Sequence, residues 1–169
     1  MSINHWIVKN LVCTLFLVVG GLNIYAQKDK YLIEAEAFQF KGKWSTDRSA
    51  DCMGSAMLRL NGGGSLDEQF DALTVVNIME EGDYNVWVRS ADYDKLPGTR
   101  LFRLSVDEKP MKESGKHGKV GFYWENAGCV QLAKKQVLLR LHDTKRNFGR
   151  CDAILLVKDH SINPNEMDR

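Results

Sequence analysis

The sequence predicts an all-β domain of the sandwich or barrel type. Short runs of alternating apolar and polar residues, each bounded by turn-forming residues, recur between positions 31 and 157. No stretch of ten or more residues has the 3.6-residue apolar period of a helix. The chain is 169 residues long, which suits one domain with a single core after an export signal is set aside.

The predicted strands follow one another with turns between them. Alternation is clearest at 84–89, where Tyr84, Val86 and Val88 share one face, and 101–106 repeats it. Glycines at 62–64 and a proline at 110 mark turns, and 112–121 is predicted to be a Gly/Lys-rich loop. The full set of predicted strands is 31–37, 55–60, 67–78, 84–89, 101–106, 129–132, 137–141 and 151–157, with 129–132 and 137–141 as a hairpin.

Residues 1–26 have the pattern of a signal peptide. Lys9 supplies the positive charge, residues 11–21 form an apolar run, and Ala26 offers a small residue for cleavage before Gln27. The run is too short for a good membrane span, although a retained anchor is the alternative. We therefore predict a secreted or periplasmic protein, off the membrane after cleavage, with a domain over 27–160 and a polar tail or linker over 161–169.

Charge and cysteine patterns exclude several functions. The chain has 23 basic and 22 acidic residues, and removing 1–26 would balance them, which argues against nucleic-acid binding. The cysteines at 52, 129 and 151 have no CxxC spacing, so neither a zinc knuckle nor a thioredoxin-type site is expected. One disulfide among them, or three inert buried thiols, remain alternatives.

Two glutamates in the first predicted strand need a partner. Glu34 and Glu36 would share one face, about 7 Å apart, and like charges that close call for a cation or a basic group. In the last predicted strand Asp152 would share a face with Ile154 and Leu156. Were the first and last strands neighbours, Asp152 could complete an oxygen-rich site suited to calcium.

Salt bridges are the alternative to calcium at these glutamates. The candidate partners are Arg59, Arg89 and Arg150.

Motifs at the two ends of the chain resemble a known family. The opening IEAEAF and the closing CDAILL are similar to those of carbohydrate-binding modules with the galactose-binding-like β-sandwich. The segments EEGDYNVWVRSADYDKLPG and FGRCDAILLVKD resemble an N-terminal domain of exported Bacteroidetes proteins. Those proteins often continue into an FAD-dependent oxidoreductase or a polysaccharide-processing enzyme.

This resemblance implies a fold, a metal and a ligand. It implies a jelly-roll β-sandwich, a structural calcium held by Glu34, Glu36 and Asp152, and sugar binding by loops at one edge. Asn147 matches an asparagine that often contacts sugar in the loop before the last strand. No catalytic domain follows in the given chain, so a free-standing module, a truncated gene and an excised fragment are all open.

The sequence offers aromatic and polar residues that could bind a sugar. Aromatic faces stack on pyranose rings, while amides and carboxylates hold the hydroxyls. The candidates are Trp44, Tyr93, Trp124, Glu125, Asn126 and Asn147. The alternative for both tryptophans is that they close the core, since tryptophan is usually well buried.

These observations predict an exported, non-catalytic accessory module. No HExxH, dinucleotide fingerprint or phosphate loop occurs in the sequence, and we expect no catalytic residue. We expect a polysaccharide or oligosaccharide ligand and, as a further partner, a catalytic protein. The alternatives are a structural or protein-docking module, or the N-terminal non-catalytic fragment of a larger exported enzyme.

Overall fold

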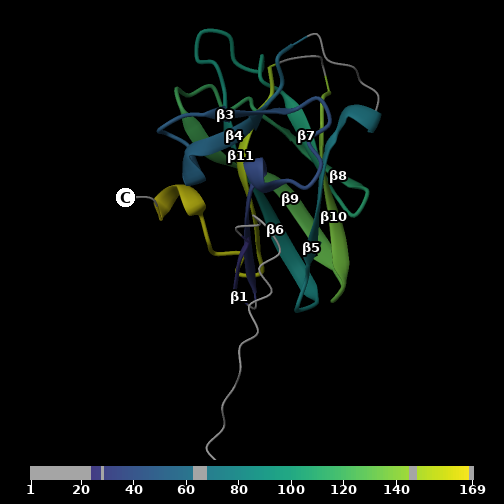
Figure 1. The fold of residues 1–169 in the computed structure, drawn as a ribbon. Helices are drawn as coiled ribbons and strands as arrows, with labels where there is room; N and C mark the ends of the chain where they lie inside the picture. The colour runs from purple at the N-terminus through teal and green to yellow at the C-terminus, as the bar shows by residue number, and fades with distance from the viewer. Residues whose placement is uncertain (1–23, 28, 63–67, 145–147, 168–169) are drawn as a thin grey trace, which may run out of the picture.

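Two antiparallel sheets packed face to face form the structure, a computed structural model (Figure 1). It describes residues 24–27, 29–62, 68–144 and 148–167. The predicted all-β jelly-roll sandwich class is confirmed. In the described part of the chain, no helix is long and apolar enough to cross a membrane.

The larger sheet is built around the last strand of the chain. Its strands are β1 (Ile24–Gln27), β2 (Lys30–Glu34), β11 (Arg150–Val157), β4 (Ala56–Arg59), β3 (Ser45–Arg48), β6 (Gly82–Ala91) and β9 (Phe122–Leu132). Strand β11 pairs with β6 on one side and with β2 and β4 on the other. The smaller sheet runs in the order β5 (Ala72–Asn77), β10 (Gln136–His142), β7 (Phe102–Val106) and β8 (Lys109–Ser114).

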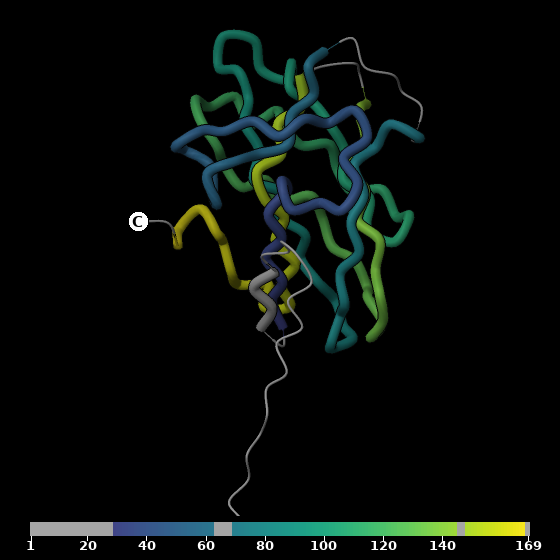
Figure 2. The backbone as a smooth tube through the Cα atoms, in the orientation of Figure 1, coloured from purple at the N-terminus to yellow at the C-terminus, as the bar shows by residue number. Residues whose placement is uncertain are grey.

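The strand that carries the opening motif, β2, lies beside the last strand of the chain, β11. Figure 2 shows the early purple chain beside the late yellow chain, and Ala153 of β11 pairs with Glu34 of β2. Strand β11 is buried on both faces: Ile154 and Leu156 point into the core, while Leu155 and Val157 pack on the outer side. The predicted approach of Asp152 to Glu34 and Glu36 required β2 and β11 to be neighbours, as they are.

Backbone irregularities change two predicted details at this junction. Strand β2 ends at Glu34 and continues as a 3₁₀ turn over Ala35–Ala37, so Glu36 does not lie on a strand. The pairing of β11 with β6 shifts register between Cys151 and Ala153, which makes Asp152 the extra residue of a bulge. The bulge separates Asp152 from the core face of Ile154 and Leu156, correcting the predicted alternation.

Other strands differ from the prediction for reasons of composition. Strand β3 has the sequence STDR and β8 buries only Met111 and Ser114, so neither shows the apolar alternation that the prediction used. Strand β9 begins at Phe122, seven residues before the predicted 129–132. Trp124 therefore lies in a strand rather than in a loop.

Residues 158–167 lie against the outer face of the larger sheet. A 3₁₀ turn covers Pro164–Glu166, and Ile162 packs on the apolar cluster that contains Trp124. The Asn165 side chain accepts from the Trp124 backbone N–H at 3.0 Å and donates to the Trp124 carbonyl at 2.9 Å. The part of the predicted 161–169 tail that the structure describes is thus docked on the sheet.

Two further predictions can be placed. The predicted signal peptide falls outside the described residues except for 24–26, which belong to β1, and it stays a prediction. Cys52, Cys129 and Cys151 are all free thiols, so the described structure contains no disulfide among them.

Replacing Asn165 should loosen this terminal segment. Asn165→Ala removes both hydrogen bonds to Trp124, each contributing about 0.5–1.5 kcal/mol, and we expect the free energy of unfolding to fall by about 1–2 kcal/mol. Urea unfolding measures this, and hydrogen exchange should rise over 158–167. Asn77→Ala, at an exposed position on β5, is the control; equal behaviour of the two variants would contradict the docking.

Candidate functional site

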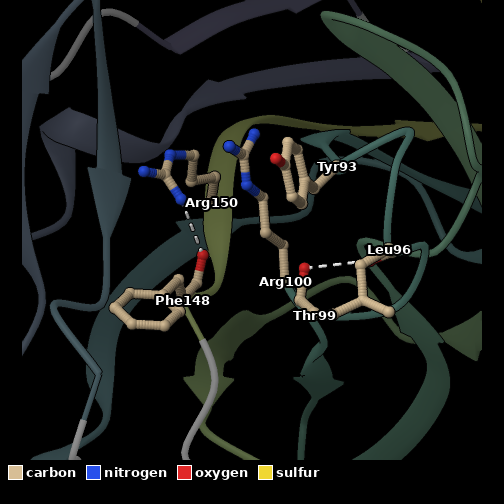
Figure 3. Close-up of a pocket in the computed structure, with 6 residues that line it drawn as sticks. All are labelled: Tyr93, Leu96, Thr99, Arg100, Phe148 and Arg150. Atoms are coloured by element: carbon tan, nitrogen blue, oxygen red, sulfur yellow. Dashed lines mark hydrogen bonds between the residues drawn. The ribbon is translucent and has the colours of Figure 1, made fainter.

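A pocket of about 300 Å³ lies where two loops meet at one end of the sandwich (Figure 3). One loop follows β6, and the other is the short segment that enters β11. The lining residues are Tyr93, Leu96, Thr99, Arg100, Phe148 and Arg150. The pocket therefore combines apolar walls with cationic groups.

Two exposed aromatic rings border this pocket. Tyr93 is 42% exposed and Phe148 50% exposed, so both rings are accessible to a ligand. The Phe148 ring lies over Gly62, where an added Cβ would come within 2.7 Å of it. Gly62 also has a φ of +77°, so both the turn and the close approach of the ring favour glycine.

Two arginines lie near these rings: in Figure 3, Arg100 runs beside Tyr93 and Arg150 lies above Phe148. Arg100 donates to the Asp92 carbonyl at 2.9 Å, with its guanidinium 5.8 Å from the centre of the Tyr93 ring. Arg150 donates to the Phe148 carbonyl at 3.1 Å. Burial, followed by the charge of Arg100, lowers the pKa of Arg150, yet an arginine remains a cation at neutral pH.

Asp92 organises the loops around the pocket. Its buried carboxylate accepts from the backbone N–H groups of Tyr93 at 2.7 Å, Gly98 at 3.0 Å and Gly118 at 2.7 Å. The Asp92 carbonyl also accepts a hydrogen bond from Arg100. Asp92 therefore closes the loop after β6, fastens it to the β8–β9 loop and positions the Arg100 side chain in the pocket. Charge-assisted hydrogen bonds to backbone N–H groups are among the stronger ones in proteins.

Trp44 packs in the core next to the segment that carries Phe148, and it is too buried to stack on a sugar. It is 3% exposed and packs edge-on against Phe102, with ring centres 5.6 Å apart. An added Cβ on Gly149 would lie 3.2 Å from the Trp44 ring, so glycine lets the pocket segment rest on the core. Trp44 therefore closes the core, which was the alternative to sugar binding for this residue.

The other predicted sugar-binding residues do not gather at the pocket. Trp124 is 7% exposed within the outer apolar cluster, and Asn126 is exposed near the β9 bulge, accepting from the Gly128 N–H at 2.9 Å. Glu125 accepts from the Ser90 hydroxyl and from the Gly115 N–H, which fastens the β8–β9 loop. Asn147 lies outside the described residues. Of the predicted set that the structure describes, Tyr93 alone lines the pocket.

Five lining residues were not among the predicted sugar-binding residues. They are Leu96, Thr99, Arg100, Phe148 and Arg150. A signal existed for Leu96, an apolar residue in a polar loop, whereas nothing local distinguishes these two arginines from the others. Their role depends on which loops the fold brings together.

A second candidate site is the carboxylate cluster formed by Glu34, Glu36 and Asp152. An added Cβ on Gly54 would lie 2.7 Å from Glu36 Oε1 and 2.8 Å from Glu34 Oε1, so both glutamates reach the same spot. The Asp152 side chain is fully buried and accepts from the Met53 N–H at 3.2 Å. The cluster thus unites both ends of the domain, as the sequence motifs predicted.

Arginine neutralises only part of this cluster. Arg89 forms an ion pair with Asp152. Arg59 instead pairs with Asp47 at 2.9 Å, and Arg150 faces the pocket. No ion pair of an arginine with either glutamate occurs in the described structure. The alternative that arginines neutralise Glu34 and Glu36 is therefore not supported there.

The cluster retains unsatisfied acidic oxygens. Glu36 Oε2 and Asp152 Oδ1 are buried without a hydrogen-bond partner. Burial, with the nearby charges of Glu34 and Asp152, raises the pKa of Glu36 to about 7. Burial also raises the pKa of Asp152, against the effect of Arg89.

Calcium suits the donor chemistry of the cluster, because it takes six to eight oxygen ligands. The buried, unpartnered carboxylate oxygens favour a cation at this place. Across the described residues, however, no three His, Cys, Asp or Glu side chains already have the arrangement of a metal site. Arg89 occupies one oxygen of Asp152, so a metal ion would have to compete with it.

The fold is that of family 35 carbohydrate-binding modules. No protein-family model and no curated protein matches the chain. Among solved structures, a family 35 carbohydrate-binding module from Clostridium thermocellum matches with a TM-score of 0.58 and 17% identity, covering 75% of this chain and 97% of that one. The resemblance read from the end motifs is confirmed at the level of fold.

Larger proteins contain the same fold. A GH26-CBM35 β-(1,4)-mannanase from Podospora anserina matches with a TM-score of 0.60 and 17% identity, over 82% of this chain and 31% of that one. An exo-β-1,3-galactanase from Phanerochaete chrysosporium matches with a TM-score of 0.56 and 17% identity, over 74% and 28%. This chain therefore spans about a third of either enzyme.

Ionisation of Glu36 should make stability depend on pH. The folded protein raises its pKa from 4.5 to about 7, so the folded state binds the proton more tightly and stability falls as pH rises through this window. Glu36→Gln keeps a neutral side chain. In EDTA we expect its melting temperature to exceed that of the wild type by about 4 °C at pH 8 and to match it near pH 5.

Thermal melts from pH 5 to pH 8 measure this gap. Glu81→Gln, which removes an exposed acidic side chain elsewhere, is the control for net charge. Parallel melting curves for wild type and Glu36→Gln would show that Glu36 does not titrate in this range.

Proposed function

We propose that this chain is a carbohydrate-binding accessory module and that the pocket between Tyr93 and Phe148 is its glycan site. The observation that carries the proposal is the pair of exposed aromatic rings beside hydrogen-bond donors. The fold supports it, because this chain covers nearly all of a family 35 carbohydrate-binding module. A volume of about 300 Å³ is at the lower end of ligand pockets and suits a short stretch of glycan.

The chemistry of binding follows from the lining. A pyranose ring offers an apolar face, which stacks on an aromatic ring, and hydroxyls, which need partners. Tyr93 and Phe148 supply the rings. Arg100, Arg150 and Thr99 supply polar groups around them, and the two loops are already held by Asp92 and by the core beneath Gly149. A site held in place before binding loses little conformational entropy on binding.

The module would act outside the cytosol and without catalysis. We propose secretion or export to the periplasm, on the strength of residues 1–26. A catalytic protein is the proposed partner, since the matched mannanase and galactanase chains are about three times the length of this fold. The module would then hold that partner at its polysaccharide.

Removing either exposed ring should weaken glycan binding. Tyr93→Ala and Phe148→Ala each delete a stacking surface, and we expect the dissociation constant for a bound polysaccharide to rise about tenfold, or 1.4 kcal/mol. Affinity gels with a panel of polysaccharides identify a ligand, and calorimetry measures it. Phe40→Ala is the matched control, because Phe40 is 53% exposed and does not line the pocket.

Two outcomes would contradict the proposal. One is the absence of binding to every glycan of a broad panel by the folded wild-type protein. The other is a loss of binding in Phe40→Ala equal to that in the pocket variants.

We also propose that the carboxylate cluster binds calcium as a structural ion. Glu34, Glu36 and Asp152 would hold it, and the ion would neutralise charges that Arg89 leaves uncompensated. Bound calcium would fasten the end of β2 to the start of β11. The support is the convergence of oxygen donors from both ends of the domain.

Calcium should therefore stabilise the protein, and more so at high pH. Deprotonated Glu36 is the better ligand, so the gain in melting temperature on adding 2 mM CaCl₂, roughly 4 °C or more by mass action, should be larger at pH 8 than at pH 5.5. Glu36→Gln and Asp152→Asn should lose most of the gain, and Glu81→Gln should keep it. An unchanged melting temperature in wild type at pH 8 would refute the calcium site.

A further inference from the structure

We infer that His117 is a positioning residue for the proposed glycan pocket: its neutral imidazole holds the β8–β9 loop to the loop that carries Tyr93, and acid releases it. The inference rests on the proposed function and adds a regulation to it, a fall in glycan affinity at low pH. It comes from the hydrogen bonds of a side chain that lies outside the pocket lining.

The two ring nitrogens of His117 have opposite partners, which fixes the protonation state of the ring. Nε2 lies 3.1 Å from the Ser90 carbonyl oxygen of β6, an acceptor, so this nitrogen carries a proton. Nδ1 accepts from the Lys119 backbone N–H at 3.2 Å, so it needs a free lone pair. Both bonds exist together only in the neutral imidazole with its proton on Nε2.

These two bonds shape the part of the β8–β9 loop that reaches the pocket loop. The His117 ring ties the loop to β6 and turns it back on itself around Gly118, which has a φ of +70°. The Gly118 N–H donates to the Asp92 carboxylate at 2.7 Å. Asp92 in turn holds the Tyr93 N–H at 2.7 Å and the Arg100 side chain at 2.9 Å, and both of those residues line the pocket. The imidazole therefore acts on the pocket through Gly118 and Asp92.

A proton on Nδ1 of His117 would break this arrangement. Two N–H donors, those of the ring and of Lys119, would then face each other without an acceptor between them. Histidine is the side chain that ordinarily changes charge between about pH 5 and pH 8. Because the closed loop has no place for that proton, the closed loop is favoured at neutral pH and lost as pH falls.

The charged and titratable groups around His117 come from its own loop, from β9 and from the residue that follows β6. They are Lys116 and Lys119 of the loop, Tyr123 and Glu125 of β9, and Asp92. Both carboxylates accept backbone N–H groups of the loop, and neither forms an ion pair with the imidazole in the described structure. The centre of the Tyr123 ring is 5.2 Å from that of the imidazole and 4.5 Å from Lys119 Nζ. A protonated imidazole would thus be a second cation at this ring, and like charges repel.

The test measures glycan affinity of the full chain at two pH values. Affinity gels at pH 7.5 with galactomannan, xyloglucan and dextran choose the probe, which is the one that binds most tightly. These polymers are uncharged, so only the protein titrates. Calorimetry then compares binding at pH 7.5 and pH 5.0, and we expect the dissociation constant to rise about fivefold in acid, as for the loss of one or two hydrogen bonds.

Matched variants assign the pH dependence to His117. His117→Gln keeps an uncharged side chain with a donor and an acceptor, and we expect it to bind with nearly the same affinity at both pH values. His160→Gln is the control, because His160 is exposed and lies 3.4 Å from the Asp83 carbonyl, at the opposite end of β6 from Asp92. It should keep the fall seen in wild type. Glu36, whose pKa is about 7, is present in every variant, so its ionisation cancels in the comparison.

A second measurement follows the ring and the loop without a glycan. Nitrogen-15 chemical shifts of the imidazole should show His117 with its proton on Nε2 alone at pH 7.5. Hydrogen-exchange protection factors, which correct for the pH dependence of exchange itself, should fall over 115–119 at pH 5.0 in wild type. The same amides of His117→Gln should stay protected at pH 5.0.

The outcomes separate the two proposals. Equal affinity of wild type at both pH values, or an equal fall in wild type and His117→Gln, would overturn the role of His117 and keep the carbohydrate-binding function. A proton on Nδ1 at pH 7.5 would also overturn that role. No binding of any glycan at either pH would overturn both proposals.

Discussion

The position of β11 between β2 and β6 is the constraint on which the rest of the structure depends. An interior strand that is buried on both faces needs apolar side chains to cover each side. Ile154 packs in the main core between the sheets, whereas Leu155 packs in the outer apolar cluster with Trp124. Its neighbour β2 carries the opening motif, so β11 joins the early and late parts of the chain. Both candidate sites follow from it, because Arg150 enters the pocket and Asp152 enters the carboxylate cluster.

The strands of the sheet could be predicted from the sequence more accurately than the bulge and the 3₁₀ turn that interrupt them. Alternation in residues such as Tyr84 and Val86 depends on local chemistry. The pairing of β2 with β11 was expected only from the family resemblance of the end motifs, and the structure contains it. The bulge at Asp152 and the 3₁₀ turn at Ala35–Ala37 depend on tertiary packing, which alternation does not encode. The carboxylates converge despite these two errors in the predicted geometry.

The pocket was harder to predict because it is assembled from distant segments. The largest aromatic candidates, Trp44 and Trp124, went to apolar clusters, where their large apolar surface is removed from water. The exposed rings are the smaller ones, Tyr93 and Phe148. They meet because two loops about fifty residues apart in sequence reach the same end of the sandwich, and no local pattern encodes that meeting.

Charge is distributed along β11 in a way that stability alone does not explain. The chain is nearly neutral, yet Arg150 faces Arg100, while two residues later Asp152 joins two glutamates. Each cluster holds like charges in partial burial, which costs stability, and redistribution of the same residues would relieve both. Natural sequences tolerate such conflicts mainly at functional sites. The basic pair at the pocket and the acidic cluster at the junction of β2 and β11 are therefore the two candidate functional sites.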